Sequence, residues 1–201
     1  MVSHLLNIDE GLAKQVAGGL GLKEVPQPAE AAKLPKNLKN SPALSIQLNG
    51  PRSFKGRKVG ALVTDGVDIN ILEALKAALK NEGALLEIVA PKVGGVEASD
   101  GTWIQAAQKV DGGPSVPYDA VALLPSEERN SWRKSRPRAT SLPMLFAHMK
   151  FIGYVEPAAI LFGKAGVPES RDEGFILLKG ADCSAFIAAC RQLRYWARVK
   201  G

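Results

Sequence analysis

The chain has little of what metal sites, disulfide frameworks and membrane spans are built from. Its 201 residues include two cysteines and two histidines. His4 and His148 have no Cys, His, Asp or Glu partner at a ligand spacing, so we expect no metal site. No apolar run approaches the roughly 18 residues that a membrane helix requires. The first residues, MVSHLLNIDEG, show neither a basic leader nor an apolar stretch ending in small residues, which predicts a cytoplasmic location.

The two cysteines do not provide a cross-link. Cys183 and Cys190 lie seven residues apart in a predicted helix, which separates them by about 10 Å along the helix axis. A disulfide requires a much closer approach. Both fall on an apolar stripe with Phe186 and Ile187, which favours small buried hydrophobic residues over a redox or nucleophilic role.

Phosphate-binding glycine loops are also absent from the sequence. The segment TDGVD, residues 64–68, follows the first predicted strand and contains one glycine, so it matches neither the dinucleotide fingerprint nor the P-loop. The net charge of +6 permits weak anion binding without requiring it. The run Arg129–Arg138, RNSWRKSRPR, combines five cations with Trp132. This pattern is typical of a loop that follows nucleic-acid phosphates, but a solvated loop against another subunit has the same composition, and we do not expect nucleic-acid binding.

A strand, a helix and a second strand are predicted between Arg57 and Pro91. The apolar run Val59–Val63 has no polar alternation, as expected for a parallel strand buried on both faces. Asp68 is predicted to cap the helix that follows, and Gly83 to end it. The apolar stripe of this helix comprises Leu72, Leu75, Ala78 and Leu79. The second apolar run, Ala84–Ala90, completes a right-handed βαβ unit.

The rest of the chain continues this alternation. Val93–Val116 contains Asp-Gly turn signals and predicts a β-hairpin insertion. The further predicted elements are the strands Tyr118–Leu124, Phe151–Val155 and Gly174–Leu178 and the helices Thr140–Lys150, Pro157–Ala165 and Asp182–Val199. Together they indicate an α/β, flavodoxin-like, doubly wound and mainly parallel five-stranded sheet with helices on both faces, plus a β-hairpin insertion.

The N-terminal residues predict a different organisation. Residues 1–22 contain a short amphipathic helix with Leu12, Val16 and Leu20 on one side. Residues 23–53 contain five of the thirteen prolines, several lysines and few acids, a composition that favours an extended arm. We therefore expect three parts: the helix at 1–22, a loose linker arm at 23–53, and the flavodoxin-like domain at 54–201.

Three stretches carry a resemblance to a known family. The first is KGRKVGALVTDGVDINILEALKAALKNEGALLEIVAPKVGGVEASDGTWIQA, which resembles the C-terminal domain of the large-subunit haem catalases. Those domains are similar to the PfpI-like, class I glutamine amidotransferase fold. VSHLLNIDEGLAKQVAGGLGL resembles the last helix of the catalase body, and SPALSIQLNGPRSFKGRKV the linker after it. The resemblance implies a fragment of a larger tetrameric enzyme that dismutes hydrogen peroxide with haem bound elsewhere.

The resemblance also implies where a PfpI-like enzyme would place its nucleophile. That position is a strained elbow between a strand and a helix, which here reads FIGYVEPAA and offers Gly153, Tyr154, Val155 and Glu156. None of these is a usual thiol or hydroxyl nucleophile. Asp65 and Asp68 lie where the assisting carboxylate would be, but a turn residue and a helix cap explain them more simply. We expect no catalytic residue in this chain.

Haem ligation can be tested against one short pattern. Arg191–Tyr195, RQLRY, matches the bare R-x-x-x-Y pattern of the family's proximal ligand. It lies in the terminal predicted helix, in a different sequence context, and the distal residues belong to a domain outside this chain. We expect Arg191, Arg194 and Arg198 to complement the C-terminus of that helix and to face solvent. No cofactor is therefore expected in this fragment.

These observations favour a non-catalytic accessory domain that supports assembly and stability of a catalase. Its expected partners are the catalase body of the same chain and neighbouring subunits. Two alternatives stay open: an ATP-independent, chaperone-like binder of unfolding proteins, since several PfpI-like proteins are chaperones, and a cryptic PfpI-like hydrolase or glyoxalase. The missing elbow cysteine weighs against the last of these.

Overall fold

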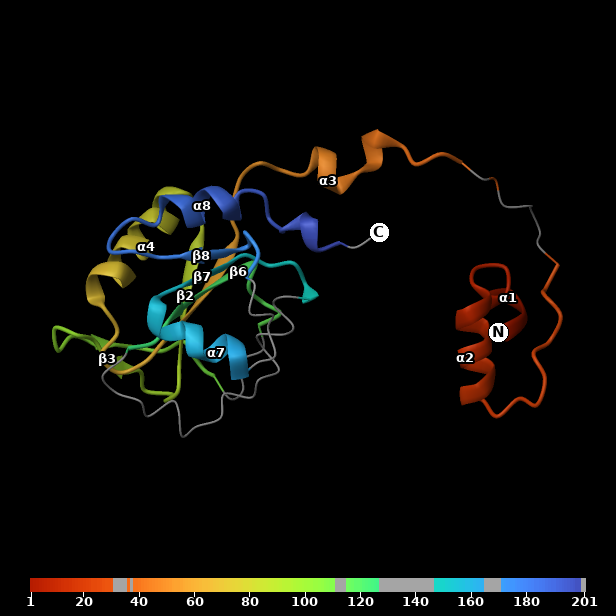
Figure 1. Cartoon of the computed structure of the whole chain (residues 1–201), viewed down its shortest axis with the longest axis horizontal. Coiled ribbons are helices and arrows are strands. Elements are labelled where there is room, and N and C mark those ends of the chain that lie inside the picture. The colour runs from red at the N-terminus through yellow and green to blue at the C-terminus, as the bar shows by residue number, and fades with distance from the viewer. Residues whose placement is uncertain (31–35, 37, 111–114, 127–146, 165–170, 200–201) are drawn as a thin grey trace. The chain divides into compact units, whose positions relative to one another are not determined.

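The chain forms two compact units, residues 1–44 and 45–201, which are described separately (Figure 1). A computed structural model describes residues 1–30, 36, 38–110, 115–126, 147–164 and 171–199. The basic run Arg129–Arg138 and most of the predicted helix Thr140–Lys150 lie outside these ranges. Within them, every helix is too short or too polar to cross a membrane.

The helices and strands follow one another in the order expected for an α/β domain behind a short helical unit. The α-helices are α1 (Val2–Leu5), α2 (Glu10–Gly19), α3 (Ile46–Asn49), α4 (Ile69–Asn81), α7 (Ala159–Lys164) and α8 (Ser184–Cys190). The strands are β1 (Lys58–Val63), β2 (Leu85–Ala90), β3 (Val96–Glu97), β4 (Trp103–Ile104), β5 (Gln108–Lys109), β6 (Ala120–Leu124), β7 (Ile152–Tyr154) and β8 (Phe175–Leu177). Three 3₁₀ turns are η1 (Pro42–Leu44), η2 (Glu156–Ala158) and η3 (Trp196–Arg198).

The first unit is a pair of helices with a very small core. Asp9 caps α2 by accepting a hydrogen bond from the amide of Leu12 at 2.6 Å. Ala13 and Ala17 are buried against Val2 of α1, because their small side chains let the two helices approach closely. The predicted helix is confirmed, but Leu12 and Leu20 are 44% and 61% exposed. This unit therefore keeps apolar side chains on its surface.

The second unit is built on a six-stranded parallel sheet with the order β5-β2-β1-β6-β7-β8. The chain moves outward from β1 in one direction through β2 and in the other through β6, so the order reverses between β1 and β6. The antiparallel pair β3–β4 is the predicted hairpin insertion. The flavodoxin-like prediction is confirmed. The end of the predicted hairpin segment adds a sixth strand, β5, beside β2.

An apolar core lies on each face of the sheet. Helices α4 and α8 cover one face, where Leu72, Leu75 and Phe186 pack on the inward side chains of β1 and β6. Helix α7 covers the other face with Leu161 and Phe162 (Figure 1). The stripe predicted for α4 is confirmed, since Leu72, Leu75 and Leu79 are at most 2% exposed.

The C-terminal segment differs from the prediction. The helix predicted over Asp182–Val199 ends at Cys190, because Leu193 adopts a left-handed backbone conformation with φ 65°. The chain then turns, and the amide of Tyr195 donates to the carbonyl oxygen of Met149 at 2.7 Å. Cys183 is the N-cap of α8 and Cys190 its last residue. Both are buried free thiols, as predicted.

Residues 191–198, which we call the arginine strap, cross the edge of the sheet where the parallel strands begin. Each arginine contacts a carboxylate that lies one to three residues before a different strand. Arg191 forms two hydrogen bonds with Glu82, ahead of β2. Arg194 lies 3.9 Å from the carboxylate of Asp119, ahead of β6. Arg198 forms a bidentate pair with Asp172, ahead of β8, at 2.6 and 2.7 Å.

The arginine strap corrects the expectation that Arg194 and Arg198 face solvent, while Arg191 is exposed as expected. The side chain of Arg198 is 6% exposed and that of Arg194 is 28% exposed, whereas that of Arg191 is 50% exposed. The reason is the early end of α8, after which the side chains of Arg194 and Arg198 turn onto the sheet edge instead of continuing a helix surface.

Candidate functional site

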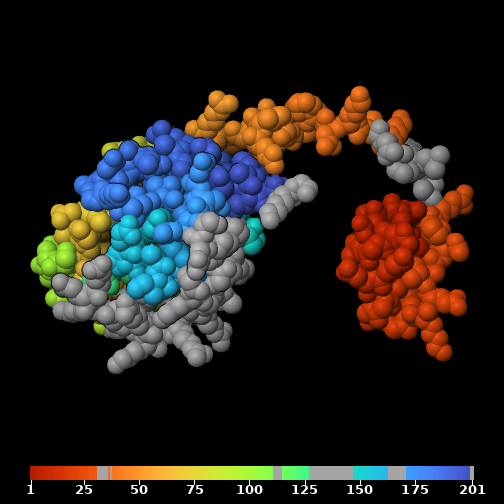
Figure 2. Space-filling view, viewed as in Figure 1, coloured from red at the N-terminus to blue at the C-terminus, as the bar shows by residue number. Residues whose placement is uncertain are grey.

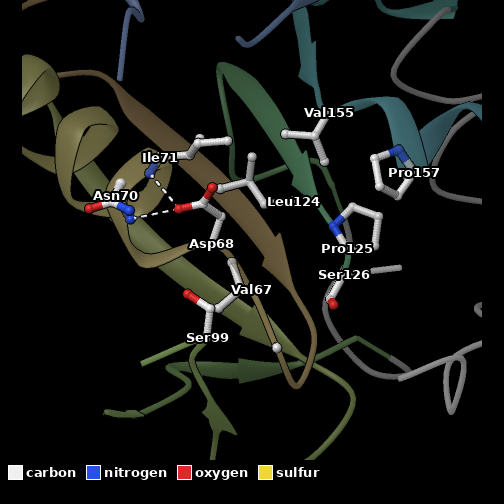
Figure 3. A pocket seen from close by; sticks show the side chains of 11 residues that line it. Val67, Asp68, Asn70, Ile71, Ser99, Leu124, Pro125, Ser126, Val155 and Pro157 are labelled. Atoms are coloured by element: carbon white, nitrogen blue, oxygen red, sulfur yellow. Dashed lines mark hydrogen bonds between the residues drawn. The ribbon is translucent and has the colours of Figure 1, made fainter. Parts of the chain in front are cut away.

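A pocket of about 530 Å³ lies at the carboxyl ends of β1, β6 and β7 (Figure 3). This is the place where the strand order reverses, and open α/β sheets commonly bind ligands there. Its apolar wall includes Ile71, Leu124 and Val155. Its polar lining includes Asp68 and Asn70 at the start of α4, Ser99 after β3 and Ser126 after β6. The volume lies within the range of ordinary small-molecule sites.

The start of α4 carries no unused amide donor for a phosphate. The carboxylate of Asp68 accepts hydrogen bonds from the amides of Asn70 and Ile71 at 2.8 and 3.4 Å (Figure 3). The amide of Ile69 donates to the hydroxyl of Ser99 at 3.3 Å. The amide of Leu72 donates to the Asp68 carbonyl. The predicted helix-cap role of Asp68 is confirmed, and the helix terminus is saturated from within the chain.

Ser99 reaches α4 because the hairpin folds back against it. The atoms around residue 100 (light green) lie beside those at the start of α4 (yellow) in Figure 2. Asp65 holds the hairpin in place: its carboxylate accepts from the amide of Glu97 at 3.1 Å and pairs with Lys92 at 3.0 Å. Asp65 therefore does more than form the predicted turn, because its carboxylate also links the end of β1 to the hairpin.

The elbow after β7 has ordinary backbone geometry. Val155 has φ −100° and ψ 157°, which is extended backbone, and its amide donates to the carbonyl of Leu123. Glu156 follows at the start of η2 and is exposed. The ring of Tyr154 faces Phe162 at 5.3 Å and the guanidinium of Arg171 at 5.0 Å. The residues at this elbow include neither a thiol nor a strained backbone position to activate one.

Other reactive groups lie away from the pocket lining. Burial raises the pKa of the Cys183 thiol, and burial raises that of Cys190 further, with the charge of Asp119 adding to the effect. Both thiols are thereby poor nucleophiles at neutral pH. Among the described residues there is no group of three or more His, Cys, Asp and Glu side chains that could hold a metal ion.

The predicted haem-like pattern Arg191–Tyr195 is part of the arginine strap. The ring of Tyr195 lies edge-on to Phe151 at 6.1 Å between centroids, and the guanidinium of Arg198 lies 5.3 Å from its centroid. Arg191 pairs with Glu82. Packing and ion pairing within the domain therefore account for the presence of Arg191 and Tyr195.

A buried lysine is the main feature that sequence reasoning missed. Lys150 is 4% exposed, and its ammonium donates to the carbonyl oxygens of Tyr118 at 2.6 Å and Ser115 at 2.8 Å. Burial lowers the pKa of Lys150, and the charge of Arg194 acts in the same direction. The sequence placed it at the end of a predicted helix, where a lysine normally points to solvent, and no spacing pattern marks it as buried.

A second polar cluster on the sheet also had no signal in the sequence. Glu87 of β2 accepts hydrogen bonds from Lys58 at 2.7 Å, Gln108 at 2.8 Å and the Tyr118 hydroxyl at 2.9 Å. The bond to Lys58 holds the pKa of Glu87 below its usual value, while burial raises the pKa of Tyr118. Gly60 leaves room for this arrangement, since a Cβ there would lie 2.6 Å from the Tyr118 ring.

The fold has a solved counterpart. Oxidized DJ-1 of Toxoplasma gondii superposes with a TM-score of 0.54 at 14% sequence identity, over 72% of this chain and 98% of that one. This likeness defines the class of protein as an α/β domain with the DJ-1 architecture. At this level of identity the likeness concerns the fold alone.

Sequence comparison is more specific. Residues 55–200 match the family described as the C-terminal domain found in long catalases. The chain is 50% identical to Catalase C of Rhizobium meliloti (strain 1021) over 98% of its length, and 33% identical to Catalase HPII of Pseudomonas putida over 96%. The chain belongs to this family of catalase C-terminal domains. It spans 28% and 27% of the length of these two relatives.

Proposed function

We propose that the chain is a non-catalytic accessory domain that supports the assembly and stability of a large-subunit catalase in the cytoplasm. The single observation that carries the proposal is the 50% identity to Catalase C across 98% of this chain, including the unit at residues 1–44. The parent enzyme would dismute hydrogen peroxide at a haem held by other parts of the subunit. The expected partners are the catalase body and neighbouring subunits of a homotetramer.

The geometry supports a role without chemistry of its own. The pocket has a saturated helix terminus, and the elbow that resembles the nucleophile position of PfpI-like enzymes, residues 153–156, offers no thiol. The charged groups at the opposite edge of the sheet are engaged in ion pairs within the domain. A cryptic hydrolase or glyoxalase would need a nucleophile that this elbow does not supply.

A domain exchange in Catalase C of Rhizobium meliloti tests the accessory role. Three forms would be compared: the natural enzyme, a form lacking the segment that aligns with this chain, and a form carrying this chain in its place. We expect truncation to lower the tetramer fraction and shorten the half-life at elevated temperature, while turnover per haem in the surviving tetramers stays within about twofold. The exchanged chain should restore assembly and half-life.

A matched control uses the core of the exchanged chain. Leu75 lies on the inward face of α4 and is fully buried, so Leu75→Asp should unfold the domain and abolish the rescue. If the truncated enzyme assembles and withstands heat as well as the natural enzyme, the accessory role is wrong.

The isolated chain gives a second, direct test of the non-catalytic part. We expect the purified chain mixed with haem to show no Soret band that depends on Tyr195, and to release no oxygen from hydrogen peroxide. A Soret band lost in Tyr195→Phe, together with oxygen release, would contradict this part of the proposal.

The chaperone-like alternative is favoured by one observation, the exposed apolar side chains of the first unit. Ile8 is 77% exposed, Leu20 61% and Leu12 44%. Such side chains offer a surface to unfolding proteins without ATP. Light scattering of a heat-denatured client with the wild-type chain and with a Leu12→Ser, Leu20→Ser variant would test it. Equal turbidity with and without the chain would eliminate this alternative.

A further inference from the structure

The pocket at the carboxyl edge of the sheet has no part in the accessory role proposed above. We propose that it binds a small primary ammonium ligand with a short apolar body, held by the carboxylate of Asp68. The proposal does not depend on the accessory function. It rests on the cavity, the distribution of polar and apolar groups around it, and the state of the donors at the start of α4.

The pocket lining combines the apolar and polar groups that such a ligand needs. In Figure 3 the carboxylate of Asp68 lies beside Ile71 and Leu124, with Val155 to the right and Ser99 below. Ile71 and Leu124 are 8% and 2% exposed, so they form a firm apolar wall. A ligand with a hydrocarbon part and one polar head can therefore contact apolar and polar lining residues at once.

The polar side selects donors over acceptors. One oxygen of the Asp68 carboxylate, Oδ1, accepts both backbone amides of the helix cap, and a carboxylate has lone pairs on two oxygens. Among the described residues that line the pocket, Asp68 is the only one with a charged side chain. The cap amides that would attract an anion are occupied. An ammonium pairs with such a carboxylate through charge-assisted hydrogen bonds, whereas a carboxylate ligand is repelled.

The positive end of α4 opposes the charge of Asp68 in part, without cancelling it. A helix N-terminus carries about half an elementary charge, and the carboxylate carries a full one. The remaining negative charge is modest, and the site is partly open to water. We therefore expect a moderate preference for ammonium over an uncharged head group, and a larger preference over an anionic one.

Three probes of one size separate these head groups: n-butylamine, n-butanol and butyrate. Each would be titrated into the full chain at pH 7 and followed through the backbone amide resonances of Asn70, Ile71 and Ser99. We expect saturable shifts at millimolar butylamine, about fivefold weaker binding of butanol, and no saturation with butyrate. A higher salt concentration should weaken the binding of butylamine and leave the binding of butanol unchanged.

Asp68→Asn provides the decisive variant. Asparagine caps a helix as well as aspartate, so the fold is retained while the charge is removed. We expect butylamine affinity to fall about fivefold, to the level of butanol. Asp100→Asn is the matched control: Asp100 accepts the amide of Thr102 at 2.9 Å but does not line the pocket, so butylamine should bind unchanged.

A lysine side chain of another polypeptide presents the same head group as a free amine. Nα-acetyl-lysine methylamide distinguishes the two sources, because only a site that also accepts the peptide backbone will bind it more tightly than butylamine. Two results would overturn the proposal: equal binding of butylamine and butyrate, or butylamine affinity unchanged by Asp68→Asn. The absence of shifts at these three amides with any probe would overturn it as well.

Discussion

The two edges of the parallel sheet use charge in opposite ways. At the carboxyl edge, the pocket has one charged side chain among its described lining residues, Asp68, which is exposed and faces an open cavity. At the amino edge, Lys150 is buried against backbone carbonyls, and Arg198 is held by a bidentate carboxylate pair. Among the described residues, the amino edge is closed by internal contacts, and the pocket at the carboxyl edge is open.

This difference indicates which edge carries structure and which can carry binding. A buried cation is tolerated only when carbonyls or carboxylates surround it, and removing one partner leaves an uncompensated charge. An exposed helix cap such as Asp68 contributes much less. In many α/β proteins the carboxyl edge is also the functional edge. Substitutions at the two edges should therefore differ in their effect on stability.

The largest loss of stability is expected for Arg198→Met at the amino edge. The substitution removes the bidentate pair with Asp172 and the hydrogen bond to the Lys150 carbonyl at 2.8 Å. We expect the free energy of unfolding to fall by about 3 kcal/mol, measured by urea denaturation at pH 7. In the double variant with Asp172→Asn, the losses should be less than additive. Full additivity would show that the pair does not act as a unit.

The second largest loss of stability is expected for Lys150→Met. It keeps the aliphatic stem and removes the ammonium that binds Tyr118 and the 115–118 turn. We expect a loss of about 2 kcal/mol in the free energy of unfolding. Lys92→Met is the matched control, because Lys92 is 63% exposed in its pair with Asp65 and should change stability by less than about 0.5 kcal/mol. Equal effects would remove the contrast between the two lysines.

Glu87 predicts a pH dependence for the sheet between these edges. Its folded-state pKa is lowered, first by the hydrogen bond from Lys58, below an ordinary value of 4.5. The unfolded chain therefore binds the proton more readily, and the stability from Glu87 is present above pH 4.5 and lost as the pH falls through the folded pKa. Glu87→Gln should cost about 1.5 kcal/mol at pH 7 and flatten this acid slope. An unchanged slope in urea titrations from pH 7 to pH 3 would refute it.

The smallest effects are expected at the carboxyl edge. Asp68→Ala removes the cap of α4 and should lower the free energy of unfolding by about 1 kcal/mol. Asp68→Asn keeps the cap and should leave stability within about 0.5 kcal/mol of wild type. Thermal and urea unfolding of both variants beside Arg198→Met would decide the comparison. A loss at Asp68→Asn as large as at Arg198→Met would mean that the pocket edge is as structural as the amino edge.

Local sequence patterns predicted the fold correctly. The uniform apolar run at Val59–Val63 and the stripe on α4 predicted a βαβ unit, and the structure has both elements within a residue or two. Asp68 was predicted as the cap because capping depends on one side chain and the amides just after it. These features depend on neighbours in sequence.

The sequence alone determined the α/β class, the helix cap at Asp68 and the resemblance to catalase C-terminal domains, because each depends on residue types and short-range spacing. Only the tertiary structure decided the arginine strap, the buried Lys150 and the Glu87 cluster. The side chains that pair in these features are far apart in sequence. Gln108 lies 21 residues from Glu87, and Arg191 lies 109 residues from Glu82. A side chain is buried or exposed according to which distant segments meet it, and Leu193 ended α8 where helical spacing alone would have continued it.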